Sequence, residues 1–559
     1  MEEVTTFPWY NQYPEGVPQQ LEYDDQETLI DLFEQSFSKY ANRPAFENMG
    51  RSFTYREIDE LSTHFAAYLQ QELGLQPGDS MAIQMPNTLQ YPIAMVGALK
   101  AGLTVVNTNP LYTAREMLHQ FTDSSVKAVV ILANFAHNLE KILDQTQIET
   151  VIVTELGDQM KGMKRPLVNF VVKNVKKMVP AYRLPGALKF NDVLAKGANL
   201  SYTRPQINSE DIAFYQYTGG TTGVSKGAQL SHRNIIAHTR QVIHWFNPMF
   251  LKQKEQVVII TAIPLYHIFA LTVNGIFMIA IGSKNVLITN PRDMKGFIKE
   301  LKKHRFTLFT GVNTLFNGLL NQPEFSTVDF SNLRISVGGG MAVQDKVARK
   351  WEEVTKSPLI EGYGLSETSP VLCCNPVDGS HQIGTIGLPM PGTEVGIFDE
   401  EGNQLPAGEI GEICARGPQV FKGYLNHNNE GVFHPGGWFR TGDMGKMAED
   451  GYFSIVDRKK DMVNVSGFNV YPNEVENVIV MHEKVLEVGI IGVPDEKTTE
   501  AVKACVVRYD ESLTIEELRV YCKENLTAYK VPKHVVFLDE LPKSNVGKIL
   551  RRELREVHA

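Results

Sequence analysis

Residues 217–228 read YTGGTTGVSKGA, and they follow directly on the strand-like DIAFYQY of residues 211–217. The glycines let backbone N–H groups approach an anion closely, and the hydroxyls and one lysine add further donors. This ordered pattern predicts a phosphate-binding loop and disfavours the alternative, a flexible surface turn. It does not fit a Walker A loop, because neither Gly219 nor Gly220 has a glycine five residues later and a glycine follows Lys226.

Short runs rich in valine and isoleucine lie on both sides of this stretch. Strands are expected at residues 80–86, 103–109, 126–133, 150–155, 256–264, 284–289, 306–312 and 333–340. Helix-like segments such as LQYPIAMVGALKAG (89–102) and PRDMKGFIKELKKH (291–304) separate several of them. This alternation is typical of an α/β fold in which helices cover buried, parallel-rich sheets.

The composition and the residue pattern of the chain change at two points. After about Gly384 it becomes rich in glycine and proline with short strands, which indicates a small antiparallel β section. Beyond DRKKD (457–461) lies a compact α+β pattern, in which Asn473 and Thr514 each stand three residues before a glutamate, as in a capping box. We therefore expect a large N-terminal domain, residues 1–456, and a small mobile C-terminal domain, residues 457–559.

Composition excludes several classes of protein. Hydrophobic residues make up 43% of the chain and the net charge is −9, which suits a globular protein and argues against a nucleic-acid binder. Five cysteines without a CxxC pair favour a reduced, cytoplasmic compartment and suggest no structural zinc. The N-terminus lacks the features of a secretory signal, and the apolar run 271–281 is shorter than the roughly 20 residues that span a bilayer.

Six further motifs extend the first one along the chain. They are PLYHIF (264–269), EGYGLSET (361–368), GWFRTGD (437–443), DRKKD (457–461), SGFNVYP (466–472) and PKSNVGK (542–548). Together with YTGGTTGVSKGA they resemble the motifs of the adenylate-forming enzymes, which include acyl-CoA synthetases, luciferases and peptide-synthetase adenylation domains. The resemblance runs from about Thr28 to Arg555. Stretches such as NPLYTAREMLHQ (109–120) and TGVNTLFNGLLN (310–321) are similar, within that family, to the bacterial long-chain fatty acid–CoA ligases.

The resemblance implies an ATP-dependent acyl-CoA synthetase. Such enzymes convert a fatty acid and ATP, with Mg²⁺, to acyl-AMP and pyrophosphate, and then transfer the acyl group to the thiol of CoA. The first step turns a poor leaving group into a good one. Because negative charge develops on the α-phosphate and the pyrophosphate, positioned cations and backbone donors should stabilise its transition state.

The resemblance also implies roles for individual residues. Lys548 would bridge the carboxylate and the α-phosphate, Glu367 would hold Mg²⁺, and Thr218 would act on the leaving pyrophosphate. Within the nucleotide site, Tyr363 would stack on adenine, Asp443 would bind the ribose hydroxyls and Arg458 would contact the ribose or a phosphate. The ATP and AMP site as a whole would comprise Tyr217, Thr218, Gly219, Gly220, Thr221, Thr222, Gly223, Lys226, Gly338, Gly339, Gly340, Glu361, Gly362, Tyr363, Gly364, Asp443, Arg458 and Lys548.

The remaining implied positions concern the acyl group and CoA. His267, Val312 and Gly338 would line the acyl site, although a core histidine is nearly as good an interpretation of His267. Asp457 would be the hinge about which the small domain rotates between the two half-reactions. That rotation would bring in Ser466, Gly467 and Phe468 as part of the CoA pantetheine tunnel.

Residues 161–183 carry seven lysines and arginines and no acid, with Leu167, Phe170, Val171 and Met178 interleaved. A basic amphipathic helix is typical of a membrane-surface segment. The hypothesis is a cytoplasmic protein in reversible, peripheral contact with the inner membrane. The alternative is a helix that packs by its apolar stripe and leaves a solvated basic face.

Several alternatives stay open at this stage. A medium-chain or aryl-acid CoA ligase, or an acyl-AMP ligase that loads a carrier protein, would share the fold. A non-catalytic acyl or nucleotide sensor is the alternative of a different class, and intact Thr218, Glu367, Asp443 and Lys548 argue against it. Both a monomer and a homodimer are compatible with the sequence.

Overall fold

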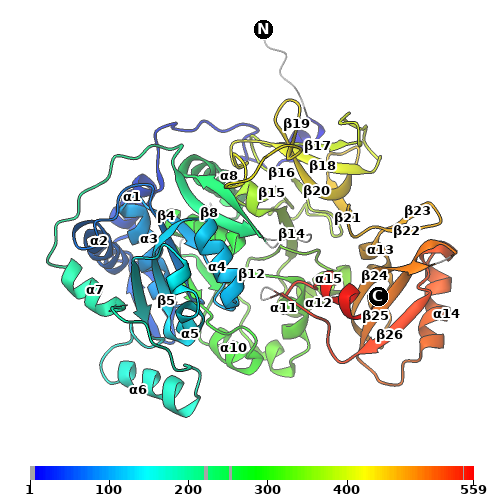
Figure 1. Cartoon of the computed structure of the whole chain (residues 1–559). Helices are drawn as coiled ribbons and strands as arrows, with labels where there is room; N and C mark the ends of the chain where they lie inside the picture. Colours follow the sequence, from blue (N-terminus) through cyan, green and yellow to red (C-terminus); the bar gives the residue numbers. More distant parts are fainter. Residues whose placement is uncertain (1–6, 219–224, 251–254, 496, 545–546, 559) are drawn as a thin grey trace, which may run out of the picture.

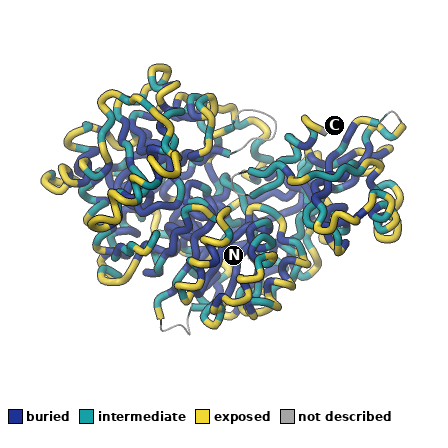
Figure 2. Tube along the Cα trace, turned by 90° about the horizontal axis from the view of Figure 1, so that it is seen from below, coloured by how far each residue is buried: buried dark blue, intermediate teal, exposed yellow. Residues whose placement is uncertain are grey.

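The computed structural model describes residues 7–218, 225–250, 255–495, 497–544 and 547–558. A large α/β body holds the N-terminal four fifths of the chain, and a small body holds the C-terminal segment, drawn in orange and red (Figure 1). Figure 2 shows buried residues throughout the interior of the large body and a separate buried core in the small one. The expected fold class is confirmed.

A seven-stranded sheet carries the phosphate-loop motif. Its order is β7-β6-β5-β3-β4-β8-β9, and all its neighbours are parallel except the hairpin of β8 and β9. The strands are β3 (Ser80–Gln84), β4 (Thr104–Asn107), β5 (Val126–Leu132), β6 (Thr150–Thr154), β7 (Leu188–Lys189), β8 (Ile212–Thr218) and β9 (Lys226–Ser231). Strands β3 and β4 are buried along their whole length, which explains their continuous apolar sequence.

A nine-stranded sheet carries the second group of motifs. Its order is β16-β15-β14-β13-β12-β10-β11-β1-β2, parallel from β14 to β1 and antiparallel at both ends. The strands are β1 (Pro44–Asn48), β2 (Arg51–Thr54), β10 (Val258–Thr261), β11 (Lys284–Leu287), β12 (Leu308–Gly311), β13 (Ile335–Gly338), β14 (Leu359–Gly364), β15 (Val371–Cys374) and β16 (Leu388–Pro389). The carboxyl ends of β12, β13 and β14 are adjacent, which is where open sheets of this kind bind ligands.

Helices cover these two sheets. In the large body they are α1 (Leu29–Tyr40), α2 (Tyr55–Gln71), α3 (Gln90–Lys100), α4 (Ala114–Asp123), α5 (Ala136–Glu140), α6 (Lys164–Phe170), α7 (Phe190–Gly197), α8 (His232–Phe250), α9 (Met278–Ala280), α10 (Met294–Leu301), α11 (Asn313–Leu320) and α12 (Asp345–Thr355). The apolar run near residues 271–281 forms the π-helix η5 (Ala270–Phe277), every residue of which is buried. No helix within the described residues is both long and apolar enough to cross a membrane.

The antiparallel section and the C-terminal segment form two five-stranded sheets. The first has the order β17-β18-β20-β19, with β21 paired to β20, and comprises β17 (Glu394–Phe398), β18 (Gly411–Arg416), β19 (Phe433–His434), β20 (Trp438–Met447) and β21 (Phe453–Arg458). The second has the order β23-β22-β25-β24, with β26 paired to β25, and comprises β22 (Val463–Val465), β23 (Phe468–Val470), β24 (Val485–Asp495), β25 (Thr499–Arg508) and β26 (His534–Leu538). It packs with α13 (Pro472–Val480), α14 (Ile515–Asn525) and α15 (Arg551–His558) around apolar clusters of its own.

The predicted domain boundary falls inside β21. This strand pairs with β20 as far as Arg458, so Asp457 and Arg458 both lie at the edge of the large body. The boundary at residue 457 stays a prediction.

One of the two predicted helix caps is wrong. Thr514 does cap α14, because its side chain accepts a hydrogen bond from the Glu517 N–H. In contrast, α13 begins at Pro472 with Tyr471 as its N-cap, so Asn473 and Glu476 lie inside the helix. Proline suits the first helical position, since it needs no hydrogen bond from its nitrogen there. The side chains of Asn473 and Glu476 bind Arg551 instead.

Candidate functional site

The predicted phosphate loop is the connection between β8 and β9, where Thr218 pairs with Lys226. Its central residues Gly219, Gly220, Thr221, Thr222 and Gly223 lie outside the described residues.

Helix α4 holds both flanks of this loop. The Tyr217 hydroxyl donates to Asp123 Oδ2 at 2.6 Å, and the His119 ring nitrogen Nε2 lies 2.8 Å from the Ser225 carbonyl oxygen. A Cβ atom on Gly227 would lie 3.0 Å from the Tyr217 ring. These contacts give Tyr217 a supporting position at the base of the loop, and its contact with nucleotide stays a prediction.

Tyr424 links the predicted metal carboxylate to the loop lysine. Its hydroxyl donates to Glu367 Oε1 at 2.6 Å, and Lys226 Nζ lies 5.2 Å from the centre of its ring. Glu367 is only 6% exposed, and this burial raises its pKa while the Tyr424 hydrogen bond opposes the rise. Tyr424 escaped the sequence analysis because the stretch FKGYLN (421–426) shows no pattern that singles it out.

A buried carboxylate, that of Asp443, lies at the centre of the site. Asp443, on β20, accepts a hydrogen bond from the Tyr363 hydroxyl at 2.7 Å and pairs with Arg458 Nε at 2.9 Å. Burial raises the pKa of Tyr363 well above its ordinary value, so its hydroxyl remains a donor at neutral pH. The strands β14, β20 and β21 thus bring together three residues that the sequence assigned to one nucleotide.

The backbone beside Tyr363 is packed at glycine-only distances. A Cβ atom on Gly364 would lie 1.8 Å from the Pro370 oxygen, and one on Gly339 would lie 3.1 Å from the Phe269 ring. Gly338 ends β13, with Gly339 and Gly340 directly after it, and Gly362 lies within β14. These glycines lie at the adjacent carboxyl ends of two central strands, where open sheets bind ligands.

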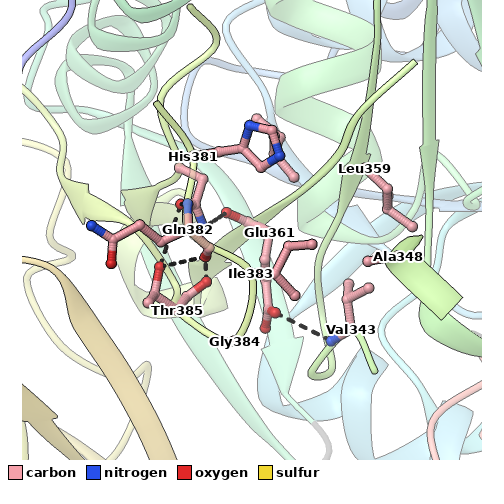
Figure 3. Close-up of a pocket in the computed structure, with 11 residues that line it drawn as sticks. Val343, Ala348, Leu359, Glu361, His381, Gln382, Ile383, Gly384 and Thr385 are labelled. Carbon is pink, nitrogen blue, oxygen red and sulfur yellow. Dashed lines mark hydrogen bonds between the residues drawn. The ribbon is translucent and has the colours of Figure 1, made fainter. Parts of the chain in front are cut away.

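Glu361 lies at the start of the same motif and lines a small cavity (Figure 3). Its Oε2 accepts a hydrogen bond from the Val343 N–H at 3.3 Å. Burial raises the pKa of Glu361 to about 8, so the carboxyl is mostly protonated at pH 7. The other lining residues are Val343, Ala348, Leu359, Ile360, Asn375, His381, Gln382, Ile383, Gly384 and Thr385.

Lys548 reaches this site from the C-terminal domain. Burial and the charge of Arg458 lower its pKa to about 8, while Asp443 opposes the shift. In turn, burial and the Lys548 charge lower the pKa of His267 to about 4, so His267 is neutral at pH 7. Val312 lies between the two domains, because its methyl groups are 3.9 Å and 3.3 Å from the Cβ positions of Gly340 and Gly547. The structure therefore places Lys548 within electrostatic range of both His267 and Asp443, and Val312 against the neighbouring Gly547.

The predicted hinge is tied to the segment that follows Lys548. Asp457 accepts from the Asn473 N–H at 2.7 Å, and Arg551 Nη1 lies 3.4 Å from its Oδ1. Arg551 also pairs with Glu476 at 2.8 Å and with Asp461 at 3.5 Å. Burial raises the pKa of Asp457 to about 6 despite the Arg551 charge.

The residues predicted for CoA lie apart from this group. Ser466 and Gly467 form the turn between β22 and β23, with φ angles of 53° and 86°. Phe468 is 58% exposed and stacks on Tyr529 at 4.9 Å within the same domain. In this conformation the structure does not bring them to Lys548.

Comparison with known proteins identifies similar sequences and structures. Residues 33–425 match the AMP-binding enzyme family, and residues 474–548 match the AMP-binding enzyme C-terminal domain. A long-chain-fatty-acid–CoA ligase of Escherichia coli O6:H1 is 53% identical over 98% of both chains. Among solved structures, the anthranilate CoA ligase AuaEII in complex with anthranoyl-AMP matches with a TM-score of 0.84 at 25% identity, over 96% of this chain and 98% of that one. ATP-bound MatB from Rhodopseudomonas palustris matches with a TM-score of 0.81 at 29% identity, over 95% of this chain and 99% of that one.

The Arg551 network predicts a large effect on the stability of the C-terminal domain. Arg551→Leu leaves Asp457 and Glu476 buried without their partner, which should lower the free energy of opening by about 3 kcal/mol. Hydrogen exchange of the β24 and β25 amides measures this directly. The neighbouring Arg552 has a side chain that is 60% exposed, and among the described residues it pairs with Glu556 alone. Arg552→Leu should therefore change the free energy of opening by less than about 0.5 kcal/mol. Equal exchange in both variants would show that the network does not stabilise the domain.

Proposed function

Because the chain belongs to the AMP-binding enzyme family, we infer that it is an ATP-dependent long-chain fatty acid–CoA ligase. Its substrates are a fatty acid, ATP and CoA. The observation that supports this chemistry is the position of Lys548. Its charge lowers the pKa of His267, a predicted acyl-site residue. Asp443 and Arg458, two predicted nucleotide-binding residues, in turn shift the pKa of Lys548. One ammonium group can therefore serve both the acid and the nucleotide.

In the first half-reaction, an oxygen of the fatty acid carboxylate attacks the α-phosphorus of ATP and pyrophosphate leaves. We propose that Lys548 holds the two anions together, since a compact ammonium on a long stem can reach both. Asp443 orients the ribose, because Tyr363 and Arg458 fix its carboxylate. Thr218 and Lys226, at the two ends of the loop, stabilise the departing pyrophosphate.

Glu367 is the candidate ligand for Mg²⁺. Its carboxylate is buried and has Tyr424 as a donor, and Mg²⁺ commonly binds one or two carboxylates together with phosphate oxygens. A bound Mg²⁺ would neutralise phosphate charge. Within the chain, Tyr424 orients Glu367, and its ring lies close to the Lys226 ammonium.

In the second half-reaction, the CoA sulfur attacks the acyl carbon and AMP leaves. We propose that the C-terminal domain, residues 457–559, rotates about Asp457 for this step. Lys548 then leaves the site, and the turn of Ser466, Gly467 and Phe468 enters it. The open space around the Cβ position of Gly467 and the exposure of Phe468 support this, because both suit a surface that makes its contacts in another conformation.

We further propose a cytoplasmic enzyme that docks reversibly on an anionic membrane surface. The predicted basic helix is shorter than expected, because only α6 and the π-helix η4 (Val171–Val175) are helical. They project from the large body at the end of the seven-stranded sheet (Figure 1). The alternative, in which the apolar stripe of residues 161–183 packs inward, is wrong for most of that segment, because five of its apolar side chains are exposed. They are Met163, Leu167, Phe170, Val175 and Met178.

A panel of acids tests the proposed reaction. With acetate, octanoate, palmitate, oleate and a cinnamate as substrates, CoA-dependent formation of AMP should be fastest with palmitate and oleate, and acyl-CoA should be the product. As a control, Lys548→Ala should lower adenylate formation roughly 100-fold while ATP binding persists. Adenylate without thioester would point to a carrier-protein acceptor, and ATP binding without any turnover would point to a sensor.

The Tyr424–Glu367 contact predicts a change in Mg²⁺ dependence. Tyr424→Phe keeps the ring but removes the donor to Glu367, so half-saturation should need roughly tenfold more Mg²⁺. Tyr452 is a matched control, because its hydroxyl donates to the Ser380 carbonyl instead, and Tyr452→Phe should leave the Mg²⁺ titration unchanged. An unchanged Mg²⁺ titration in Tyr424→Phe would contradict the assignment of Glu367 as a ligand for Mg²⁺.

Membrane docking predicts binding to phosphatidylglycerol vesicles but not to phosphatidylcholine vesicles. Replacing the exposed Lys173, Lys176 and Lys177 by glutamate should abolish flotation with the anionic vesicles, since each lysine contributes about 1 kcal/mol. The same change at the exposed Lys295, Lys299 and Lys302 is the control and should preserve flotation. Flotation that survives the first set of changes would rule out this surface.

A further inference from the structure

The turn that carries Lys548 rests on helix α11 of the large body. Thr314, in the first turn of α11, donates from Oγ1 to the Gly547 carbonyl oxygen at 3.2 Å. Gly547 has a φ of +82°, and a Cβ atom there would lie 2.4 Å from Thr314 Oγ1. The two domains therefore approach here at a distance that only glycine permits.

The large-body side of this contact is rigid. The N–H groups of Leu315 and Phe316 donate to the Val312 carbonyl, and Asn313 Oδ1 accepts from the Gln344 N–H at 3.0 Å. Phe316 is fully buried against the aromatic core, with its ring 4.7 Å from that of Trp351. Thr314 thus stands on a helix that cannot shift without disturbing the core.

On the C-terminal side, hydrogen bonds join Ser544 to Gly547 and Lys548. The Ser544 N–H donates to the Lys548 carbonyl at 2.7 Å, the Gly547 N–H donates to the Ser544 carbonyl at 2.9 Å, and the Lys548 N–H donates to Ser544 Oγ at 3.1 Å. Because these bonds fix the backbone on both sides of the Lys548 Cα, a contact at Gly547 determines where the Lys548 side chain begins. A second link between the domains, from Lys346 Nζ to the Val480 carbonyl, is longer at 3.4 Å.

Docking this turn places like charges together. Arg458, Lys460 and Arg551 all oppose the positive charge on Lys548, and among its strongest charged neighbours only Asp443 favours it. An uncharged hydrogen bond between the two domains adds no repulsion to these cations, and it can form before the nucleotide binds. The Thr314 hydroxyl and the Gly547 carbonyl form such a hydrogen bond.

We propose that Thr314 is a positioning residue, which docks the Lys548 turn during adenylation and has no part in thioester formation. This inference rests on the proposed function, because it assigns Thr314 to one of the two half-reactions. Thr314 acts only through Lys548. Removing its hydroxyl should therefore slow adenylation selectively, since the docked turn would be populated less often.

Thr314→Val tests the inference, because it preserves the shape of the side chain and removes the donor. Adenylation is measured as acid-dependent exchange of pyrophosphate into ATP, and thioester formation is measured from preformed acyl-adenylate and CoA. Thr314→Val should lower the exchange rate roughly fivefold, as expected for one lost hydrogen bond, and leave the thioester rate unchanged. Thr314→Ser should restore exchange, and Gly547→Ala should reproduce the defect through its clash with Oγ1.

Thr327→Val is the matched control, since Thr327 is exposed and donates only to the Glu324 carbonyl, and both of its rates should stay at the wild-type values. An exchange rate in Thr314→Val equal to wild type would overturn the inference, as would an equal loss in both half-reactions. A wild-type protein that exchanges no pyrophosphate with any fatty acid would overturn the proposed function itself, and this inference with it.

Discussion

The site depends on one ammonium group, which the C-terminal domain places beside charged residues of the large body. Asp443, Arg458 and Tyr363 are fixed by the strands of the large body, whereas Lys548 arrives on a turn of the C-terminal domain. Burial and neighbouring cations lower the pKa of Lys548, so its charged form is costly there without an anion. In the proposed reaction, a nucleotide and a carboxylate would supply anions in addition to Asp443, so the closed arrangement would be most favourable with both substrates bound.

The same constraint explains why the two domains are joined sparingly. Each has its own apolar core, and the contacts described between them are local. They are the hydrogen bonds from Thr314 and Lys346 and the approach of Val312 to Gly547. A large apolar interface would hold one arrangement too firmly for the rotation that we propose. Within the C-terminal domain the opposite holds, because Arg551 and Arg555 tie α15 to Asp461 and keep the segment that follows Lys548 attached to this domain.

The sequence was sufficient where local patterns determine structure. All eight strands expected from buried valine and isoleucine runs are present, because those residues fill the interior of two parallel-rich sheets. It failed at Asn473, where the capping pattern competes with Pro472 one residue earlier and with a buried arginine more than 70 residues away. Tyr424 and Thr314 could not be predicted, because their importance comes from partners distant in sequence, Glu367 and Gly547. The exposed apolar face of α6 also required the structure, since a periodic pattern does not show which side of a helix is covered.

The most direct measurement is a crystal structure with a non-hydrolysable acyl-sulfamoyl adenosine, which imitates the acyl-adenylate. The ribose hydroxyls should lie within hydrogen-bonding distance of Asp443. Lys548 Nζ should lie within hydrogen-bonding distance of both the acyl carbonyl oxygen and the sulfamoyl group, with Gly547 still on Thr314. An analogue bound away from Asp443, or bound at Asp443 with Lys548 pointing to solvent, would contradict the central claim that one lysine joins the acyl and nucleotide sites.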